Sequence, residues 1–198
     1  MTNYNPNVIM TYAGRLIDPT RMTRWDVDYH DVAHALAHIN RYTGHAALSY
    51  SVAEHCCRVH DWLWGHNKAT PETCLMGLWH DAAEAYIGDV AAPLKRNLPG
   101  YKHLQSKVER AVNSYMKALY DGRTVDGPDL GAIEYIDKHM CIYEARACWP
   151  TGDMHPIWRE KFGLMVPEYA EVLTPQFWSP REAKIEFLAR LGFYIHVR

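Results

Sequence analysis

Residues 78–90 read LWHDAAEAYIGDV, an apolar helical pattern that also carries one imidazole and three carboxylates. Its centre is the adjacent pair His80 and Asp81, followed by Glu84 and, after a glycine, by Asp89. Neighbouring side chains point about 100° apart on a helix, so this pair needs further ligands from elsewhere to hold one metal ion. Glu84 follows Asp81 by one helical turn, on nearly the same face. A carboxylate beside a metal ion can move protons, which makes Glu84 a candidate catalytic group.

The composition of the 198-residue chain is that of a globular protein. Apolar residues make up 48% and charged residues 22%, and we expect one domain covering residues 1–198. No apolar run approaches the roughly 18 residues of a membrane span, and the first residues lack the pattern of a secretory signal. A formal charge of −2 and a pI of about 6.6 give no reason to expect binding to duplex nucleic acid. The sequence therefore predicts a cytoplasmic protein without a membrane partner.

The five cysteines are an odd number, and two of them, Cys56 and Cys57, follow His55 in a helical pattern. This arrangement favours reduced thiols over a disulfide framework. The chain contains no C-x-x-C pair, so a zinc site built on cysteines is disfavoured.

The spacing of apolar residues predicts an all-α protein of about six or seven helices. The expected helices cover residues 31–41, 52–64, 71–86, 101–120, 130–147 and 182–191, with a short one near 168–173. Residues 1–28 are expected to form an irregular arm with at most a short hairpin, and residues 149–198 a loop-rich carboxyl-terminal region.

Two serines are expected to begin helices. Ser51 stands three residues before Glu54 and predicts a capping box, in which each side chain satisfies free amides of the first turn. Ser179, followed by a proline, begins the final helix. Gly192 is expected to end that helix, and residues 193–197 are then expected to form a short strand.

Three of the expected helices offer side chains to one metal site. His55 lies one turn after a helix start, His80 and Asp81 lie mid-helix, and Asp137 interrupts an otherwise core-facing stretch. Two imidazoles with two carboxylates suit a divalent transition ion. Cobalt, manganese, zinc and iron all fit, with magnesium as a further alternative. Glu134 is the alternative to Asp137 as the second carboxylate.

These residues resemble the H…HD…D signature of the HD-domain phosphohydrolases. The resemblance is carried by SVAEH at residues 51–55, by HDAAEAYIGD at residues 80–89 and by Asp137. The order of these motifs after Arg41-Tyr42 is similar to the bacterial 5′-deoxyribonucleotidase branch, whose phage-encoded relatives include deoxyadenosine triphosphate triphosphohydrolases. The resemblance covers about residues 30–145, and it implies a helical HD-domain bundle with a divergent extension at residues 149–198.

The resemblance also implies a role for each matching residue. Four would hold the metal: His55, His80, Asp81 and Asp137. Glu84 would handle the proton of the attacking water or of the leaving group, and Asp89 would help to place that water. Arg41 corresponds to an arginine that grips a substrate phosphate through its planar fork, and Lys95 to a second phosphate-binding cation. Tyr42 replaces the tryptophan usual beside the arginine, and its ring can stack on a base or sugar.

We therefore expect an enzyme that hydrolyses the phosphoester at the 5′ carbon of a deoxynucleotide. We favour a deoxynucleoside triphosphate, with dATP first by analogy to the phage relatives, releasing deoxynucleoside and triphosphate. The alternative is a 5′-deoxynucleotidase acting on monophosphates. The threonine common between Asp89 and the following proline is absent, which disfavours monophosphate contacts.

Two other hypotheses are a non-catalytic nucleotide sensor and an HD enzyme that acts on a signalling nucleotide. The resemblance further implies a homo-oligomer, a dimer or a hexamer, and a phage-encoded origin with function in the host cytoplasm.

Overall fold

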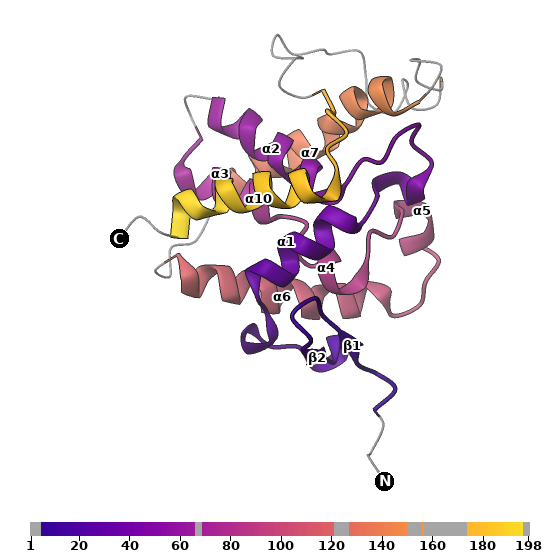
Figure 1. Ribbon diagram of the computed structural model, residues 1–198, viewed down its shortest axis with the longest axis vertical. Coiled ribbons are helices and arrows are strands. Elements are labelled where there is room, and N and C mark those ends of the chain that lie inside the picture. Colours follow the sequence, from indigo (N-terminus) through magenta and orange to yellow (C-terminus); the bar gives the residue numbers. More distant parts are fainter. Residues whose placement is uncertain (1–4, 66–68, 121–126, 150–155, 157–173, 196–198) are drawn as a thin grey trace.

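The computed structural model describes residues 5–65, 69–120, 127–149, 156 and 174–195, with side chains from residue 130 onward in the third range. The described part of the chain is mainly helical, which confirms the all-α prediction (Figure 1). Its helices are α1 (Tyr29–His38), α2 (Val52–Gly65), α3 (Pro71–Trp79), α4 (Glu84–Ile87), α5 (Ala92–Lys95), α6 (Tyr101–Leu119), α7 (Gly127–Cys148) and α10 (Pro180–Ile195). The expected short helix near 168–173 lies outside the described residues.

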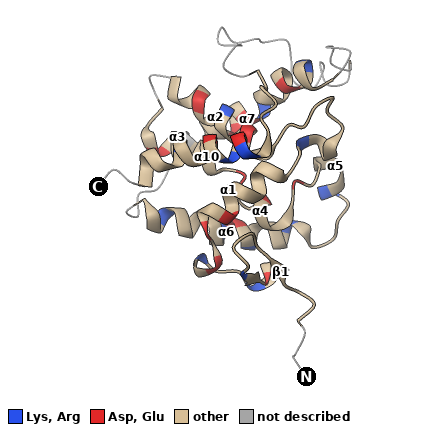
Figure 2. Ribbon diagram, in the orientation of Figure 1, with Lys and Arg blue, Asp and Glu red and all other residues tan. Residues whose placement is uncertain are grey.

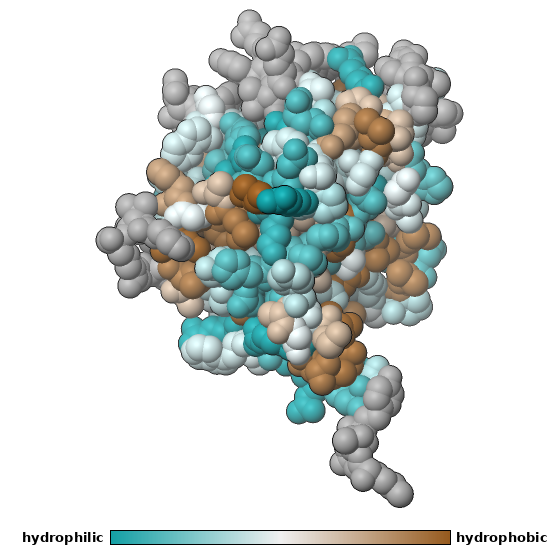
Figure 3. All heavy atoms as spheres, in the orientation of Figure 1, coloured by the Kyte–Doolittle hydropathy of each residue, from teal (hydrophilic) through white to brown (hydrophobic). Residues whose placement is uncertain are grey.

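The amino-terminal arm forms a small hairpin and two tight turns. Strands β1 (Ile9–Met10) and β2 (Leu16–Ile17) pair antiparallel, and the 3₁₀ turns η1 (Pro19–Arg21) and η2 (Arg24–Asp26) follow and pack on α6. The face drawn in Figure 3 is mainly hydrophilic, and an apolar patch marks the hairpin, where Met10 and Leu16 are exposed. None of the described helices is long and apolar enough to cross a membrane.

The core lies where α10 crosses α1 and α2 and where α3 packs along α2 (Figure 1). Leu36 of α1, Leu63 of α2 and Phe187 and Leu191 of α10 are almost completely buried. Burying a side chain of this kind stabilises a fold by about 1.5–3 kcal/mol. This packing holds α2 and α3 against each other, and these helices lead directly into the candidate site.

The helix expected over residues 71–86 is interrupted at the central motif, so His80 and Asp81 do not lie mid-helix. α3 ends at Trp79, and α4 begins only at Glu84. Nδ1 of His80 lies 2.8 Å from the carbonyl oxygen of Gly77, the acceptor that a continuing α-helix gives to the amide of Asp81. Amides that follow donate to carbonyl oxygens three residues earlier in the chain, as in the tighter 3₁₀ turn. In this turn the side chains of His80 and Asp81 point towards the same site.

Two further expectations about helix ends were wrong. α10 runs through Gly192 to Ile195, with no strand over 193–195, because Leu191 and Tyr194 are both buried against α2 and neighbouring helices. Residues 196–198 lie outside the described part. At the start of α2 the amide of Glu54 does bond the hydroxyl of Ser51, but the Glu54 carboxylate does not complete a capping box. It accepts instead from backbone amides of residues 176–178.

Candidate metal centre

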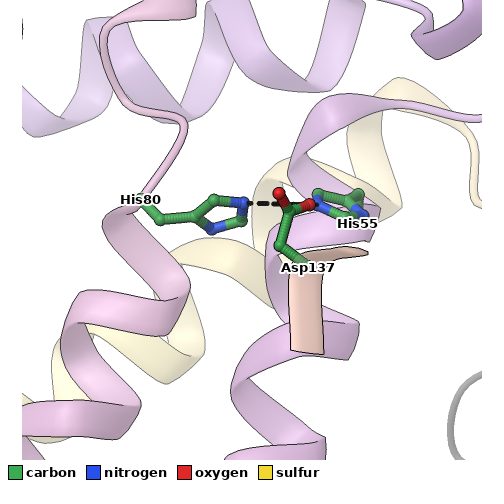
Figure 4. Close-up of side chains that lie close together, drawn as sticks. All are labelled: His55, His80 and Asp137. Carbon is green, nitrogen blue, oxygen red and sulfur yellow. Dashed lines mark hydrogen bonds and ion pairs between the residues drawn. The ribbon is translucent and has the colours of Figure 1, made fainter. Parts of the chain in front are cut away.

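Four side chains that the sequence singled out, from three parts of the chain, lie close to one another. His55 comes from α2, His80 and Asp81 from the turn after α3, and Asp137 from α7. Nε2 of His55 lies 3.3 Å from Nε2 of His80 and 3.1 Å from Oδ1 of Asp137. Oδ2 of Asp81 lies 3.2 Å from Nε2 of His80. Figure 4 shows the Asp137 carboxylate between the two rings.

These separations fit one shared ion. Ligand atoms bound to a transition ion at about 2.1 Å lie roughly 3–3.5 Å from one another. The separations from His55 to Asp81 and from His80 to Asp137 are each 3.8 Å. The ligand atoms of His55, His80 and Asp137 all lie within 4.8 Å of one another, and Asp81 joins this group through His80. Cys56, with His80 and Asp81, forms a second group whose ligand atoms also lie within 4.8 Å of one another.

Both imidazoles are oriented by their other ring nitrogen. Nδ1 of His55 lies 2.6 Å from Oε1 of Glu144, and Nδ1 of His80 lies against the Gly77 carbonyl. A hydrogen bond at Nδ1 places the proton there and leaves Nε2 free to bind a metal. These contacts turn Nε2 of each ring towards the cluster, where it could act as a metal ligand.

The charges of the site favour a cation. Burial opposes a positive imidazole, but Asp81, Cys56 and Asp137 together outweigh it and raise the pKa of His80 well above its ordinary value. Burial likewise opposes ionisation of Asp81 and Asp137, but the two imidazoles outweigh it and lower the pKa of both carboxyls. Two ionised carboxylates thus face two rings that hold protons in the metal-free protein, and a metal ion would displace those protons.

Glu84, the first residue of α4, is buried beside this cluster. Burial, together with the charges of Asp81 and Asp89, raises the pKa of Glu84 to about 9. Its Oε1 lies 3.4 Å from Nζ of Lys95, and within the described residues its Oε2 has no hydrogen-bond partner. Burial also raises the pKa of Asp89. Glu84 therefore holds a proton near neutral pH, as a general acid requires.

Arg41 and Tyr42 lie in the 3₁₀ turn η3 (Arg41–Gly44), which joins α1 to the segment before α2. Nη1 of Arg41 lies 3.6 Å from Oδ2 of Asp81, and its Nη2 lies 3.2 Å from Oε2 of Glu144. Nε of Arg41 is buried and finds no hydrogen-bond acceptor in the part of the chain that is described. The Tyr42 hydroxyl donates to Glu144, and its ring packs edge-on against Trp149. Arg41 is thus held beside the candidate metal ligands.

Two residues of the site were missed by the sequence analysis. Glu144 lies two helical turns after Asp137 on the same face of α7, so the i, i+7 spacing could have pointed to it. Burial opposes its charge, but Arg41 and His55 outweigh that and lower the pKa of Glu144 to about 2. Tyr101, at the start of α6, has its ring 5.9 Å from Nζ of Lys95. Its buried hydroxyl has no partner among the described residues.

The other predicted alternative lies outside the cluster. Glu134 is exposed on α7 and pairs with Lys138, one turn along the helix.

All five cysteines are free of disulfides, as expected. Figure 2 shows acidic and basic residues gathered around the labels of α2 and α7, two helices that contact each other.

No protein-family model matches the chain. The chain is 34% identical over 105 residues to the uncharacterized protein YfdR of Escherichia coli K12, a match covering 52% of this chain and 55% of that protein. It is 36% identical over 102 residues to an uncharacterized protein of Rhodobacter capsulatus, covering 50% of each. The chain thus spans about half the length of the curated relatives it matches. Neither name states an activity, so function has to be inferred from the geometry of the site.

Proposed function

We propose that this protein is a metal-dependent phosphohydrolase of the HD-domain type, which releases the deoxynucleoside from a deoxynucleotide. The observation that carries the proposal is the close grouping of His55, His80 and Asp137, with Asp81 against His80 and beside a guanidinium. A mixed nitrogen and oxygen set of this kind suits cobalt, manganese, zinc or iron. When bound, such an ion would polarise a phosphate oxygen and lower the pKa of the attacking water.

The chain's own residues supply the rest of the chemistry. Arg41 has an unpartnered Nε among the described residues and can donate to a phosphate oxygen while Asp81 and Glu144 hold its other nitrogens. Glu84, with its pKa of about 9, can give its proton to the 5′ oxygen that leaves the phosphorus. Asp89, whose charge helps to raise the pKa of Glu84, would help to place the attacking water, as the resemblance implies.

Among possible substrates we favour a deoxynucleoside triphosphate, with dATP first. Lys95 contacts the Glu84 carboxylate and therefore lies next to the site. The neighbouring Arg96 and Lys102 are exposed and could hold the outer phosphates. Water would attack the α-phosphorus and the bond to the 5′ oxygen would break, giving deoxynucleoside and triphosphate. The alternative is a deoxynucleoside monophosphate, which would give inorganic phosphate by the same attack.

The test is incubation of the full chain with each deoxynucleotide and cobalt or manganese, followed by chromatographic analysis of the products. We expect deoxyadenosine and triphosphate from dATP. Phosphate from monophosphates, with triphosphates untouched, would establish the alternative substrate. Nucleotide binding without any turnover would refute the hydrolase and favour the non-catalytic sensor.

A matched pair of variants controls for damage to the fold. Asp137→Asn removes a proposed ligand from α7 and should abolish turnover. Glu134→Gln changes an exposed carboxylate one turn earlier on the same helix and should leave turnover unchanged. Equal activity in both variants would contradict the proposed metal centre.

A further inference from the structure

Glu144 is a fully buried carboxylate on which four side chains converge. Nδ1 of His55 lies 2.6 Å from its Oε1, and the hydroxyl of Tyr50 lies 3.0 Å from the same oxygen. Nη2 of Arg41 lies 3.2 Å from its Oε2, which also accepts from the hydroxyl of Tyr42. A carboxylate offers about four lone-pair sites. The protein's own donors therefore saturate Glu144, and it is not available as a ligand or a base.

Three of the four donors belong to two parts of the candidate site, a metal half and a phosphate half. His55 is a proposed metal ligand, whereas Arg41 and Tyr42 belong to the turn proposed to hold phosphate. That turn is bent unusually, because Tyr42 has φ 58° and Thr43 has φ 56°, in the left-handed region that residues other than glycine rarely adopt. Such a backbone persists only where surrounding contacts hold it. The two bonds to Glu144 are contacts of that kind.

We propose that Glu144 is a positioning residue that sets the metal half and the phosphate half of the site relative to each other. It holds the Nδ1 proton of His55, so that Nε2 faces the metal position. It also holds Nη2 of Arg41 and the Tyr42 hydroxyl, so that the guanidinium lies over Asp81. The inference rests on the proposed function for the roles of the two halves, but not on which nucleotide is cleaved.

A buried carboxylate can also serve packing alone, and the chain contains such a case for comparison. Glu54 precedes His55 on α2 and is as deeply buried as Glu144. It bonds Nη2 of Arg58 at 3.2 Å and the amide of Trp178 at 2.8 Å, and its other partners are the amides of residues 176 and 177. None of these partners belongs to the candidate site. Glu54→Gln is therefore a matched control for Glu144→Gln.

The first measurement is cobalt affinity, by calorimetric titration of the metal-free full-length protein well below its unfolding temperature. Both glutamine variants should unfold at a lower temperature than the wild type. Only Glu144→Gln should also lose cobalt affinity, by roughly 10–100-fold, the usual effect of removing a group that orients a metal-binding histidine. Glu144→Asp, which keeps the charge, should recover part of that loss. Equal cobalt affinity in the Glu144 and Glu54 variants would overturn the inference.

The second measurement addresses the phosphate half, with inorganic triphosphate as the probe. Glu144→Gln should weaken triphosphate binding, and Glu54→Gln should not. Tyr50→Phe removes the one donor that belongs to neither half, and both affinities should survive it. Unchanged triphosphate binding in Glu144→Gln would refute the link between the halves. If cobalt and triphosphate affinities change as expected while the wild type hydrolyses no nucleotide, the positioning role stands and the proposed function fails.

Discussion

Replacing Glu84 with glutamine should stabilise the metal-free protein at neutral pH while it removes turnover. The Glu84 side chain is buried, and burial with the charges of Asp81 and Asp89 raises its pKa to about 9, from 4.5 for an ordinary glutamate. The folded protein therefore keeps this carboxyl neutral at pH 7.5, whereas the unfolded chain ionises it. Glutamine resembles the neutral carboxyl in shape and does not ionise in either state.

The size of the effect follows from the two pKa values. The folded-state pKa of Glu84 is the higher one, so its contribution to stability is fully present below pH 4.5 and is lost as pH rises towards 9. Each pH unit in that window corresponds to about 1.4 kcal/mol, so up to about 4 kcal/mol is lost by pH 7.5. Relaxation of side chains and water around a buried charge reduces such penalties. We expect the variant to be more stable by about 2–4 kcal/mol at pH 7.5.

The assay is urea unfolding of the wild type and of Glu84→Gln in the presence of a chelator at several pH values from about 4.5 to 7.5. The free-energy difference between the two proteins should grow with pH. Glu134→Gln, at an exposed carboxylate, should show no such trend. A difference that does not change with pH, or a glutamine variant less stable at pH 7.5, would refute the reasoning.

Three further predictions concern the same site. Protons compete with metal for His80, whose pKa is raised, so cobalt affinity should fall between about pH 8 and pH 6, and a pH-independent affinity by calorimetry would contradict this. The folded-state pKa of Glu144 is about 2, so its contribution to stability is present above pH 4.5 and is lost as pH falls towards 2; urea midpoints of wild type and Glu144→Gln should converge over that range. Gly77→Ala would press a methyl group against the Leu63 side chain, costing about 1–3 kcal/mol, and should lower both the thermal midpoint and the cobalt affinity. An unchanged midpoint would show that α2 and α3 are not packed this closely.

The periodic positions of apolar residues were enough to predict the long helices, although not the break after α3 or the short α5. In α6, Val108, Val112 and Met116 recur at four-residue spacing, and all three are buried. The start of α10 could also be predicted from a short stretch of sequence, because Ser179 and Glu182 cap each other within one turn. The residues proposed as ligands could also be named, because their motifs stand in the order that the resemblance to HD-domain phosphohydrolases implies.

Only the tertiary structure decided which partner each buried polar group takes. Periodicity indicates which face of a helix is buried, but it cannot say which carbonyl, amide or guanidinium from a distant segment will lie opposite. His80 takes the carbonyl of Gly77 and ends α3, and the Glu54 carboxylate turns from its own helix to the amides of residues 176–178. Glu144 likewise joins His55 to Arg41 across about a hundred residues of chain. A buried polar group must find a hydrogen-bond partner, and the packing of the helices determines which one is within reach.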